Sequence, residues 1–189
     1  MRTTKKEELP SDFYERIRSK IQRRIGRTLR LAGRVADLGC GDCELAQYLA
    51  QNWRQHVIGI DISDDTIPKD RHYDPNVDLH CIHHNAQHLD FMKEASMDAV
   101  VMKYALHEMT YRHKILREAY RILRPGGTIL IVEFPKGSLA QDLWNENYFT
   151  PDQLRNMLEK AGFCEVRVRL PFRSQIAWVQ GWKPMVNAQ

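Results

Sequence analysis

The chain has 189 residues and a formal net charge of +4; 43% of its residues are hydrophobic and 28% are charged. This balance is typical of one globular domain and excludes a fibrous repeat or a long disordered tail. No stretch approaches the ~20 apolar residues that cross a bilayer, and the basic N-terminus lacks the apolar stretch of a secretion signal. We therefore expect a cytoplasmic protein without a membrane span, in which the four cysteines are reduced thiols.

The first predicted element is an amphipathic helix that begins near Ser11 or Asp12. Its apolar residues recur at every fourth position and would share one face; they are Phe13, Ile17, Ile21, Ile25 and Leu29. Seven basic residues and no acidic residue lie between Arg16 and Arg30. The basic face is either the solvated surface of a docked helix or a surface for an anionic partner, and charge alone does not decide between them.

Short apolar runs alternate with stretches of helical spacing in the middle of the chain. The runs lie at residues 35–38, 56–60, 77–82, 98–102 and 128–132, and the helical stretches include residues 43–51 and 111–123. Near-continuous apolar runs suit strands that are buried on both faces of a parallel sheet. The order predicts an α/β fold with a doubly wound, mostly parallel sheet and helices on both faces. Residues 124–127, Arg-Pro-Gly-Gly, predict a sharp turn from helix into strand.

The C-terminal part predicts one more helix and two strands. Residues 150–153 read Thr-Pro-Asp-Gln, which has the capping residue, first-turn proline and third-position glutamine of a helix start, and Gly162 would end this helix. Apolar residues then alternate with arginines at 166–170, and a second run follows at 174–182. The sheet is therefore predicted to finish in an antiparallel edge hairpin.

A glycine-rich turn follows the first predicted strand. Residues 37–43 read Asp-Leu-Gly-Cys-Gly-Asp-Cys, and glycines at such a turn let the backbone approach a ligand closely. Position 44 is Glu44 where a dinucleotide fingerprint has its third glycine, and the Gly-Lys-Ser/Thr ending of a phosphate loop is absent. Asp42 and Glu44 would repel a pyrophosphate at the helix start, so we expect a nucleoside ligand without phosphates.

Asp61 ends the second predicted strand, 20 residues after Gly41. A carboxylate at this place can accept both hydroxyls of a ribose across the point where the strand order reverses. The alternative is an acidic residue that caps the following turn. The glycine-rich turn upstream favours ribose binding.

Together, these motifs resemble the class I S-adenosylmethionine-dependent methyltransferases, in particular the group similar to the ubiquinone/menaquinone-biosynthesis methyltransferases. The resemblance covers about residues 33–163 and includes the glycine motif, Asp61, and the segments 85–91, 97–102, 105–107 and 116–127. It implies a seven-stranded, Rossmann-like fold. It also implies S-adenosyl-L-methionine as cofactor and S-adenosyl-L-homocysteine as product.

The resemblance further implies a set of cofactor-binding residues near the ends of the predicted strands. They are Asp37, Gly39, Cys40 and Gly41 at the amino-acid end of the cofactor, Asp61 at the ribose, Ile62, Asn85 and Ala86 at the adenine, and Lys103 and Tyr104 beneath the sulfonium. The family usually has an aspartate in place of Asn85, a departure that would weaken recognition of the adenine amino group. The helix expected after the second strand is also poor here, because residues 63–78 contain two prolines and many charges.

The segment after the fourth strand bears on the acceptor. Residues 102–105 read Met-Lys-Tyr-Ala, unlike the Asn/Asp-Pro-Pro-aromatic turn of enzymes that methylate base amines or glutamine. No cysteine lies between Cys81 and Cys164, which disfavours a cysteine nucleophile for pyrimidine carbon-5 methylation. Direct displacement by an O, N, S or carbon nucleophile remains.

His107 is the first candidate for a catalytic base, because it follows the fourth strand and its ordinary pKa suits proton transfer. Tyr104, Glu108 and Glu133 are weaker candidates. The alternative for His107 is a residue at a helix start with its ring bonded to the backbone.

A metal site is weighed because Cys40 and Cys43 have zinc-ligand spacing and residues 80–88 contain further histidines and Cys81. The cysteine pair lies inside the glycine motif and has no second Cys-x-x-Cys to complete it. We therefore expect no bound metal.

Three functions stay open at this point. The first is a methyltransferase for a small-molecule acceptor, in which residues 1–32 form a basic lid over the methyltransferase domain at residues 33–189. The second is an RNA methyltransferase, since residues 39–43 also look like the motif of the nucleolar ribosomal-RNA-processing enzymes and the basic helix could contact phosphates. The third is a non-catalytic, cofactor-binding module. The sequence does not indicate an oligomeric state.

Overall fold

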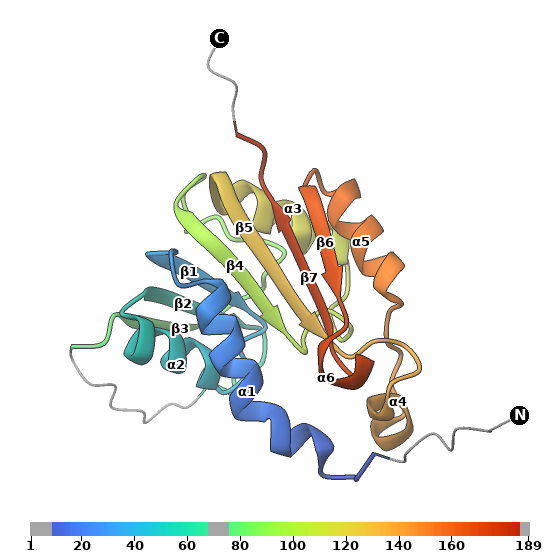
Figure 1. Cartoon of the computed structure of the whole chain (residues 1–189). Coiled ribbons are helices and arrows are strands. Elements are labelled where there is room, and N and C mark those ends of the chain that lie inside the picture. The colour runs from blue at the N-terminus through green and yellow to red at the C-terminus, as the bar shows by residue number, and fades with distance from the viewer. Residues whose placement is uncertain (1–8, 68–75, 186–189) are drawn as a thin grey trace, which may run out of the picture.

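The computed structural model describes residues 9–67 and 76–185. Within these residues, seven strands form a single sheet in the order β3-β2-β1-β4-β5-β7-β6 (Figure 1). In chain order the elements are α1 (Phe13–Thr28), β1 (Arg34–Leu38), α2 (Glu44–Trp53), β2 (His56–Asp61), β3 (Leu79–His83), β4 (Met97–Lys103), α3 (Arg112–Ile122), β5 (Leu123–Glu133), α4 (Leu139–Trp144), α5 (Pro151–Lys160), β6 (Cys164–Arg169), α6 (Pro171–Ser174) and β7 (Ala177–Trp182).

The strand order confirms the predicted fold class. Strands β1 to β5 are all parallel, while β7 lies antiparallel between β5 and β6. Because β1 pairs with both β2 and β4, the chain changes direction across the sheet at this pair. In open α/β sheets, ligands bind outside the carboxyl ends of the strands at such a switch point.

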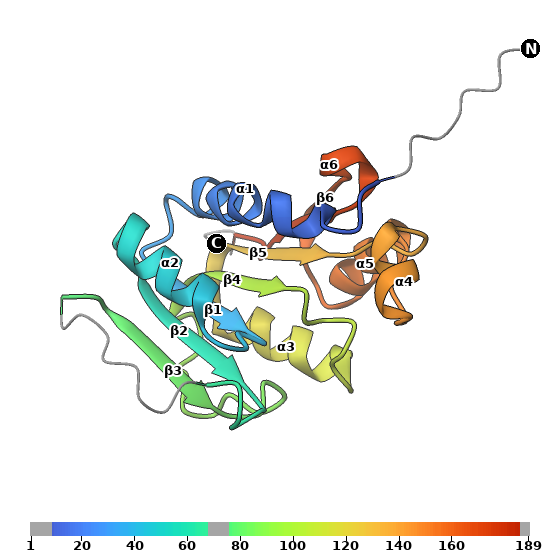
Figure 2. The ribbon, with the colours of Figure 1, turned by 90° about the horizontal axis from the view of Figure 1, so that it is seen from below.

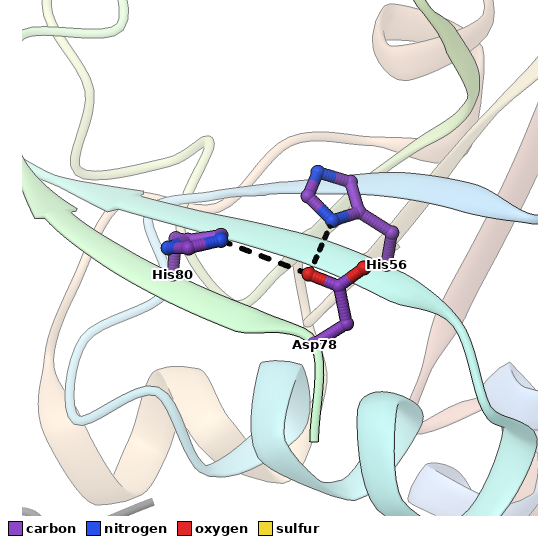
Figure 3. Close-up of side chains that lie close together, drawn as sticks. All are labelled: His56, Asp78 and His80. Atoms are coloured by element: carbon purple, nitrogen blue, oxygen red, sulfur yellow. Dashed lines mark hydrogen bonds and ion pairs between the residues drawn. The ribbon is translucent and has the colours of Figure 1, made fainter. Parts of the chain in front are cut away.

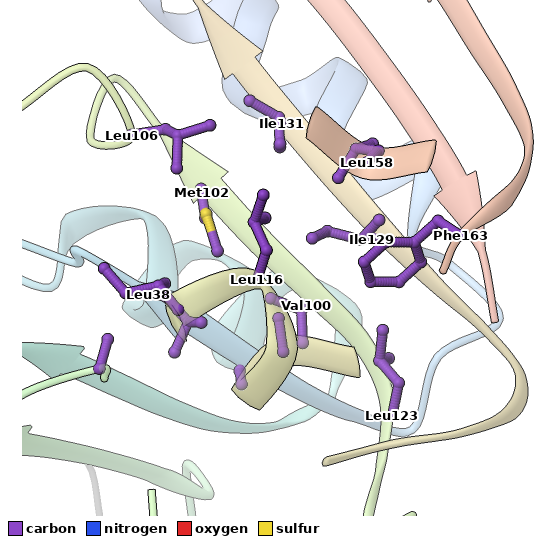
Figure 4. Packing of buried hydrophobic residues seen from close by; sticks show 14 of the residues in the cluster. Leu38, Val100, Met102, Leu106, Leu116, Leu123, Ile129, Ile131, Leu158 and Phe163 are labelled. Atoms are coloured by element: carbon purple, nitrogen blue, oxygen red, sulfur yellow. The ribbon is translucent and has the colours of Figure 1, made fainter. Parts of the chain in front are cut away.

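Two helical layers cover the two faces of the sheet (Figure 2). Helices α1 and α2 pack on one face, and α3 and α5 pack on the other. In the second layer, Leu116 of α3 lies among Val100 and Met102 of β4, while Leu158 of α5 lies beside Phe163 and Ile129 (Figure 4). Among residues 9–67 and 76–185, no helix combines the length and the hydrophobicity that a bilayer crossing requires.

The start of β5 differs from its prediction. Residues 124–127 do not form a separate turn, because β5 already begins at Leu123, which is paired with Met97. The next pair along the two strands joins Ala99 to Thr128. Between these two pairs, β5 therefore has more residues than β4. Gly126 has a φ of 72° within this irregular stretch, a conformation that a residue without a side chain adopts at little cost.

The ends of the last elements also refine the prediction. Helix α5 has the predicted capping box, in which Thr150 and Gln153 exchange side-chain-to-backbone hydrogen bonds. The short helix α6 occupies residues 171–174, so the last strand begins at Ala177 rather than at 174. Between β2 and β3 the described residues form no helix, and residues 68–75 of this predicted loop lie outside the described part of the chain.

The prediction of four reduced thiols is wrong. Cys43 at the start of α2 forms a disulfide with Cys81 in β3, and only Cys40 and Cys164 are free. The sheet order brings the pair together, because β3 lies beside β2 and α2 packs against both strands. The two cysteines are 38 residues apart in sequence, and their spacing alone does not reveal this contact.

Helix α1 packs directly against α2 at Gly26. A Cβ atom at Gly26 would lie 2.0 Å from Nε1 of Trp53, so any side chain there displaces the indole ring. We expect Gly26→Val to lower the free energy of unfolding by about 1–3 kcal/mol through overpacking. Gly33→Val is the matched control, because the nearest atom to its Cβ would be a carboxylate oxygen of Asp98 at 3.4 Å. Equal denaturation midpoints for the two variants would contradict this account.

Candidate active site

A cavity of about 610 Å³ opens outside the carboxyl ends of β1, β2 and β4, at the predicted switch point. We call it the cofactor cleft. Its walls include every predicted cofactor-binding residue except Asp37; these are Gly39, Cys40, Gly41, Asp61, Ile62, Asn85, Ala86, Lys103 and Tyr104. The structure therefore gathers residues from four separate loops around one cavity.

Asp61 connects the second strand to the glycine-rich turn. Its Oδ2 accepts a hydrogen bond from the Gly41 N–H at 2.8 Å, and its Oδ1 accepts one from the Ser63 N–H at 2.9 Å. The turn-capping alternative is thus observed, yet it does not exclude ribose binding. Each carboxylate oxygen has a second lone pair, and the side chain still lines the cofactor cleft.

The glycine-rich turn is held close to the loop after β4. Gly39 has a φ of 76°, and a Cβ atom there would lie 2.5 Å from the Cβ of Ala105. A side chain at this position would push the two loops apart and distort the floor of the cleft. The predicted need for glycine here has a direct steric cause.

Asp37 lies beneath the turn rather than in the cleft. Its side chain is 1% exposed and does not line the cavity, and its Oδ2 has no hydrogen-bond partner within residues 9–67 and 76–185. Burial raises the pKa of Asp37 to about 7, although the nearby Lys103 acts in the opposite direction. Direct contact between Asp37 and a cofactor stays a prediction.

The Cys40 thiol is also part of the turn. Its Sγ lies 3.3 Å from Cys43 Sγ, and burial raises the pKa of Cys40 above its usual value. Cys40 is therefore a protonated thiol at neutral pH, which suits a packing role more than a nucleophilic one.

Arg18 of α1 was not singled out from the sequence, yet it reaches this site. Its Nε donates to Glu44 Oε2 at 3.2 Å, and its Nη2 contacts the same oxygen. The Arg18–Glu44 pair joins α1 to the start of α2. Arg18 thus neutralises the charge of Glu44, one of the two acidic residues that were expected to repel a phosphate. Only the tertiary contact between the two helices shows this.

A second cavity, of about 530 Å³, adjoins the cofactor cleft. We call it the acceptor cleft. Arg18, Lys103, Tyr104 and Glu108 line both cavities, so the two meet along these side chains. The further walls are mainly aromatic and come from α1, the end of β5 and the α4 region; they are Tyr14, Phe134, Trp144 and Tyr148. A cavity of this size and composition is typical of small-molecule sites.

Tyr14 anchors α1 beside the acceptor cleft. Its hydroxyl donates to Gln175 Oε1 at 3.1 Å and accepts from the Ala140 N–H at 2.9 Å. The contacts tie α1 to α4 and to the segment before β7. Ile17 and Ile21 are buried and Phe13 packs against the same cluster, as the helical pattern predicted.

His107 stands at the acceptor cleft between two carboxylates. Its Nδ1 lies 2.9 Å from Glu133 Oε2, and its Nε2 lies 2.9 Å from Glu146 Oε2. The alternative in which the ring bonds to the backbone is therefore wrong. Glu133 also accepts the His107 backbone N–H at 3.2 Å and is only 1% exposed, so it holds both ring and backbone.

These contacts determine how readily the imidazole takes a proton. Burial lowers the pKa of His107, but hydrogen bonds and charge from Glu133 and Glu146, with Glu108, outweigh burial and raise it above its usual value. Tyr104 is a poor base by comparison, because burial raises the pKa of its hydroxyl and its ring stacks on Phe134 at 4.1 Å between centroids. The geometry favours His107 over Tyr104 for proton transfer.

Several residues of the acceptor cleft were missed at the sequence level. Trp144 is the last residue of α4, and Glu146 and Tyr148 lie between α4 and α5, in a stretch whose sequence has no recognisable motif. The only signal was the density of aromatic residues between two helices. Their meeting at the acceptor cleft depends on tertiary contacts: Glu146 and Tyr148 contact His107, and Trp144 packs against Phe134 just after β5.

The histidine-rich stretch considered as a metal site is divided by the fold. Cys43 and Cys81 are bonded to each other and so are not thiolate ligands. His80 instead joins His56 and Asp78 at the amino ends of β2 and β3 (Figure 3). There, Asp78 Oδ1 lies 2.7 Å from His56 Nδ1 and 3.7 Å from His80 Nε2. This group lies at the opposite end of the strands from both clefts, and the absence of a metal stays a prediction.

The fold and the cofactor cleft define a nucleoside-binding α/β protein of the class I methyltransferase type. The family described as "Methyltransferase domain" matches residues 36–131. The chain belongs to this family, among the class I S-adenosylmethionine-dependent methyltransferases.

Curated relatives carry related activities in their names. The 27-O-demethylrifamycin SV methyltransferase of Amycolatopsis mediterranei is 35% identical over 109 residues, which cover 56% of this chain and 40% of that protein. The ubiquinone/menaquinone biosynthesis C-methyltransferase of Vibrio cholerae is 28% identical over 166 residues, covering 69% of this chain and 64% of that protein. This chain therefore spans about 40–64% of the length of these relatives.

Solved structures show the same fold. A SAM-dependent methyltransferase from Archaeoglobus fulgidus has a TM-score of 0.73 at 16% identity, over 90% of this chain and 98% of that one. A chain from a structure described as the "Complex between the Haloferax volcanii Trm112 methyltransferase activator and the putative methyltransferase" has a TM-score of 0.70 at 18% identity, over 94% of this chain and 99% of that one. At this level of identity the likeness extends to the fold alone.

Proposed function

We propose that this protein transfers a methyl group from S-adenosylmethionine to a small-molecule acceptor bound in the acceptor cleft. The observation that carries the proposal is the His107–Glu133 pair, because His107 lines the acceptor cleft and this cleft adjoins the cofactor cleft at Lys103 and Tyr104. A proton-accepting group thus stands beside the place where the methyl group is delivered. Family membership supplies the reaction class, and the two clefts supply the arrangement.

The residues of the cofactor cleft would orient the cofactor. Asp61 would accept the ribose hydroxyls, and the backbone at Gly39 and Gly41 would lie along the amino-acid end, as the motif implies. Bound S-adenosylmethionine supplies a methyl group on a sulfonium, which is already activated for displacement. The protein mainly has to align the acceptor with that methyl group and exclude water.

His107 would take the proton that the acceptor loses. Glu133 accepts the Nδ1–H and stabilises the imidazolium that forms, which leaves Nε2 as the proton-accepting atom. Glu146 occupies Nε2 in this structure, but its side chain is 45% exposed and can yield to an acceptor hydroxyl or amine. The arrangement favours an acceptor whose oxygen or nitrogen carries a proton.

The walls of the acceptor cleft favour a small molecule with a flat apolar part. Phe134 and Tyr148 are both 6% exposed and lie 5.5 Å apart between ring centroids, and Trp144 lies 5.0 Å from Phe134. The charged side chains that line the cleft are Glu15, Glu108 and Glu146 together with Arg18 and Lys103. Because the acids outnumber these two cations, the cleft itself lacks the excess of positive charge that binds a phosphate backbone, which favours a small acceptor over RNA.

Helix α1 would act as a fixed cover over the acceptor. Tyr14, Glu15, Arg18 and Ile21 line the acceptor cleft from one side. Because Tyr14 is bonded to the segments at Ala140 and Gln175, the cover is joined to the opposite wall. Such a wall would keep water from the reacting atoms.

The test is a methyl-transfer assay with labelled S-adenosylmethionine and three sets of acceptors: aromatic hydroxyl compounds, aromatic amines, and total RNA. We expect label in a small aromatic acceptor and formation of S-adenosylhomocysteine in equal amount. Label in RNA alone would overturn the assignment of the acceptor. Cofactor binding without transfer to any acceptor would favour the non-catalytic alternative.

The pH dependence of this reaction follows from His107. The imidazole must be neutral to accept a proton, so kcat/KM should rise with pH through a pKa above the ordinary value of 6.5. Glu146→Gln should move that midpoint to lower pH, because it removes one of the carboxylates that raise the pKa. Glu159→Gln, on an exposed turn of α5, is the matched control and should leave the profile unchanged. A profile independent of pH between 5 and 9 would contradict the role of His107.

A further inference from the structure

One basic residue of α1, Arg24, lies close to two arginines of β6. Arg24 and Thr28 of α1, with Arg167 and Arg169 of β6, surround a cavity of about 130 Å³ whose floor is Trp178 and Gln180 of β7. A shallower hollow of about 370 Å³ continues from Arg24 along the helix and is lined by Lys20, Arg23, Arg24 and Arg27. Of the residues that the structure describes, six basic and no acidic side chains line the two hollows together.

The sheet register places these side chains on one face. Arg169 pairs with Trp178 and Arg167 pairs with Gln180, and paired residues of antiparallel strands point to the same side. Trp178 is 4% exposed and belongs to the core cluster beneath α1, so this side is the one that α1 covers. Helix and strands thus present their arginines toward one another.

Two tryptophans fix the positions of the guanidinium groups. The Cζ of Arg24 lies 4.9 Å from the Trp178 ring centroid, and the Cζ of Arg167 lies 4.8 Å from that of Trp182. Stacking of this kind holds the planar group in place while leaving its N–H donors free for a ligand. The cavity is therefore partly organised before any ligand binds.

Within the described part of the chain, only one of the three arginines around the cavity has an acidic partner. Neither Arg24 nor Arg169 has an acidic partner among residues 9–67 and 76–185, and Arg167 has only the exposed Glu165 at 3.1 Å. Burial lowers the pKa of Arg24, and repulsion from the nearby Arg169 guanidinium adds to this effect. Other arginines of α1 differ, since Arg16 and Arg18 are paired with Asp12 and Glu44. An anion in the cavity would remove this repulsion.

We propose that the cavity between α1 and the β6–β7 hairpin is a binding site for a phosphoryl group, with the guanidinium groups of Arg24, Arg167 and Arg169 as its donors. Arginine forks match the oxygens of a phosphate, and three of them converge on a cavity of about 130 Å³. Thr28 and Gln180 are already bonded to Arg24 O and Thr128 Oγ1, so the arginines carry the recognition. The phosphoryl group belongs either to a small phosphorylated molecule or to a nucleic-acid backbone that continues along Lys20, Arg23 and Arg27.

The experiment uses the full chain and titrates it with inorganic phosphate and with a single-stranded RNA oligonucleotide. Binding is followed by calorimetry and by the shift of the thermal denaturation midpoint, which a ligand of the folded state raises. The test variant is Arg24→Gln/Arg169→Gln. The matched control is Arg117→Gln, an exposed arginine on α3 at the other face of the sheet.

We expect the double variant to lose at least tenfold in affinity for the probe that binds, while Arg117→Gln keeps the affinity of the unmodified protein. Phosphate binding as tight as RNA binding assigns the site to a small phosphorylated molecule. Much tighter RNA binding, with an affinity that falls steeply with salt in the unmodified protein and less steeply in the variant, assigns it to a nucleic acid. If neither probe binds, or if binding survives the double substitution, the proposal is wrong. If the double variant does not fold, Arg169→Gln alone replaces it, because Arg169 is exposed.

Discussion

Replacing His107 by asparagine should lower the rate of methyl transfer by about 10²–10⁴-fold, the usual contribution of a positioned general base. Asparagine keeps a hydrogen-bonding group near Glu133 but cannot take a proton from the acceptor. The side chain of His107 is 5% exposed, and it lines the acceptor cleft but not the cofactor cleft. Its replacement should therefore leave the affinity for S-adenosylmethionine unchanged. Steady-state kinetics and calorimetry on the same preparations separate the two quantities.

Two further variants make this result specific. His113→Asn is the control, because His113 is an exposed histidine of α3 outside both clefts. Glu133→Gln should also reduce the rate and should lower the pKa seen in the pH profile, since it removes the first of the carboxylates that raise the pKa of His107. A His107→Asn enzyme with full activity would show that the acceptor needs no base.

The same pair links pH to stability in the opposite sense to activity. Because the pKa of His107 is raised in the folded protein, the ion pair with Glu133 contributes fully to stability below the ordinary value near 6.5. This contribution is lost as pH rises through the raised pKa. The protein should therefore be less stable in the pH range where the proposed base is neutral and active.

Replacing Asp61 by asparagine should weaken S-adenosylmethionine binding by about tenfold or more. A hydrogen bond to a charged group contributes about 1.5–3 kcal/mol, and one such bond alone corresponds to at least about a tenfold change in affinity. The structure adds a second reason, because Asp61 also accepts the Gly41 N–H at 2.8 Å and so holds the glycine-rich turn against β2. Calorimetric titration of the cofactor measures the loss.

The control for Asp61 is Asp65→Asn, an exposed aspartate a few residues further along the chain. Denaturation midpoints of both variants show whether the substitution at Asp61 unfolds the loop or only weakens the ligand contact. Unchanged cofactor affinity in a folded Asp61→Asn protein would remove Asp61 from the binding site. It would leave the family assignment intact, since that rests on residues 36–131 as a whole.

The sequence by itself determined the features that depend on local spacing. Buried parallel strands have near-continuous apolar runs, so β1, β2, β4 and the later part of β5 were predicted close to their observed bounds. The Thr-Pro-Asp-Gln start of α5 gave its capping box, because that motif satisfies the first backbone donors of a helix within four residues. The position of Asp61 at the end of β2 was predicted for the same kind of reason, since the order of the elements sets which strand ends lie next to the switch point, while its role at the ribose stays a prediction.

Only the tertiary structure decided which distant side chains meet. The contact of Cys43 with Cys81 depends on the position of β3 beside β2, and the Arg18–Glu44 pair depends on the packing of α1 on α2. The partners of His107 come from 26 and 39 residues further along the chain, and the arginines of the proposed phosphoryl site come from α1 and β6. Periodicity records which face of an element is buried but not which element covers it. For this reason the class of the protein was readable from the sequence, whereas the acceptor cleft and the basic cavity required the folded chain.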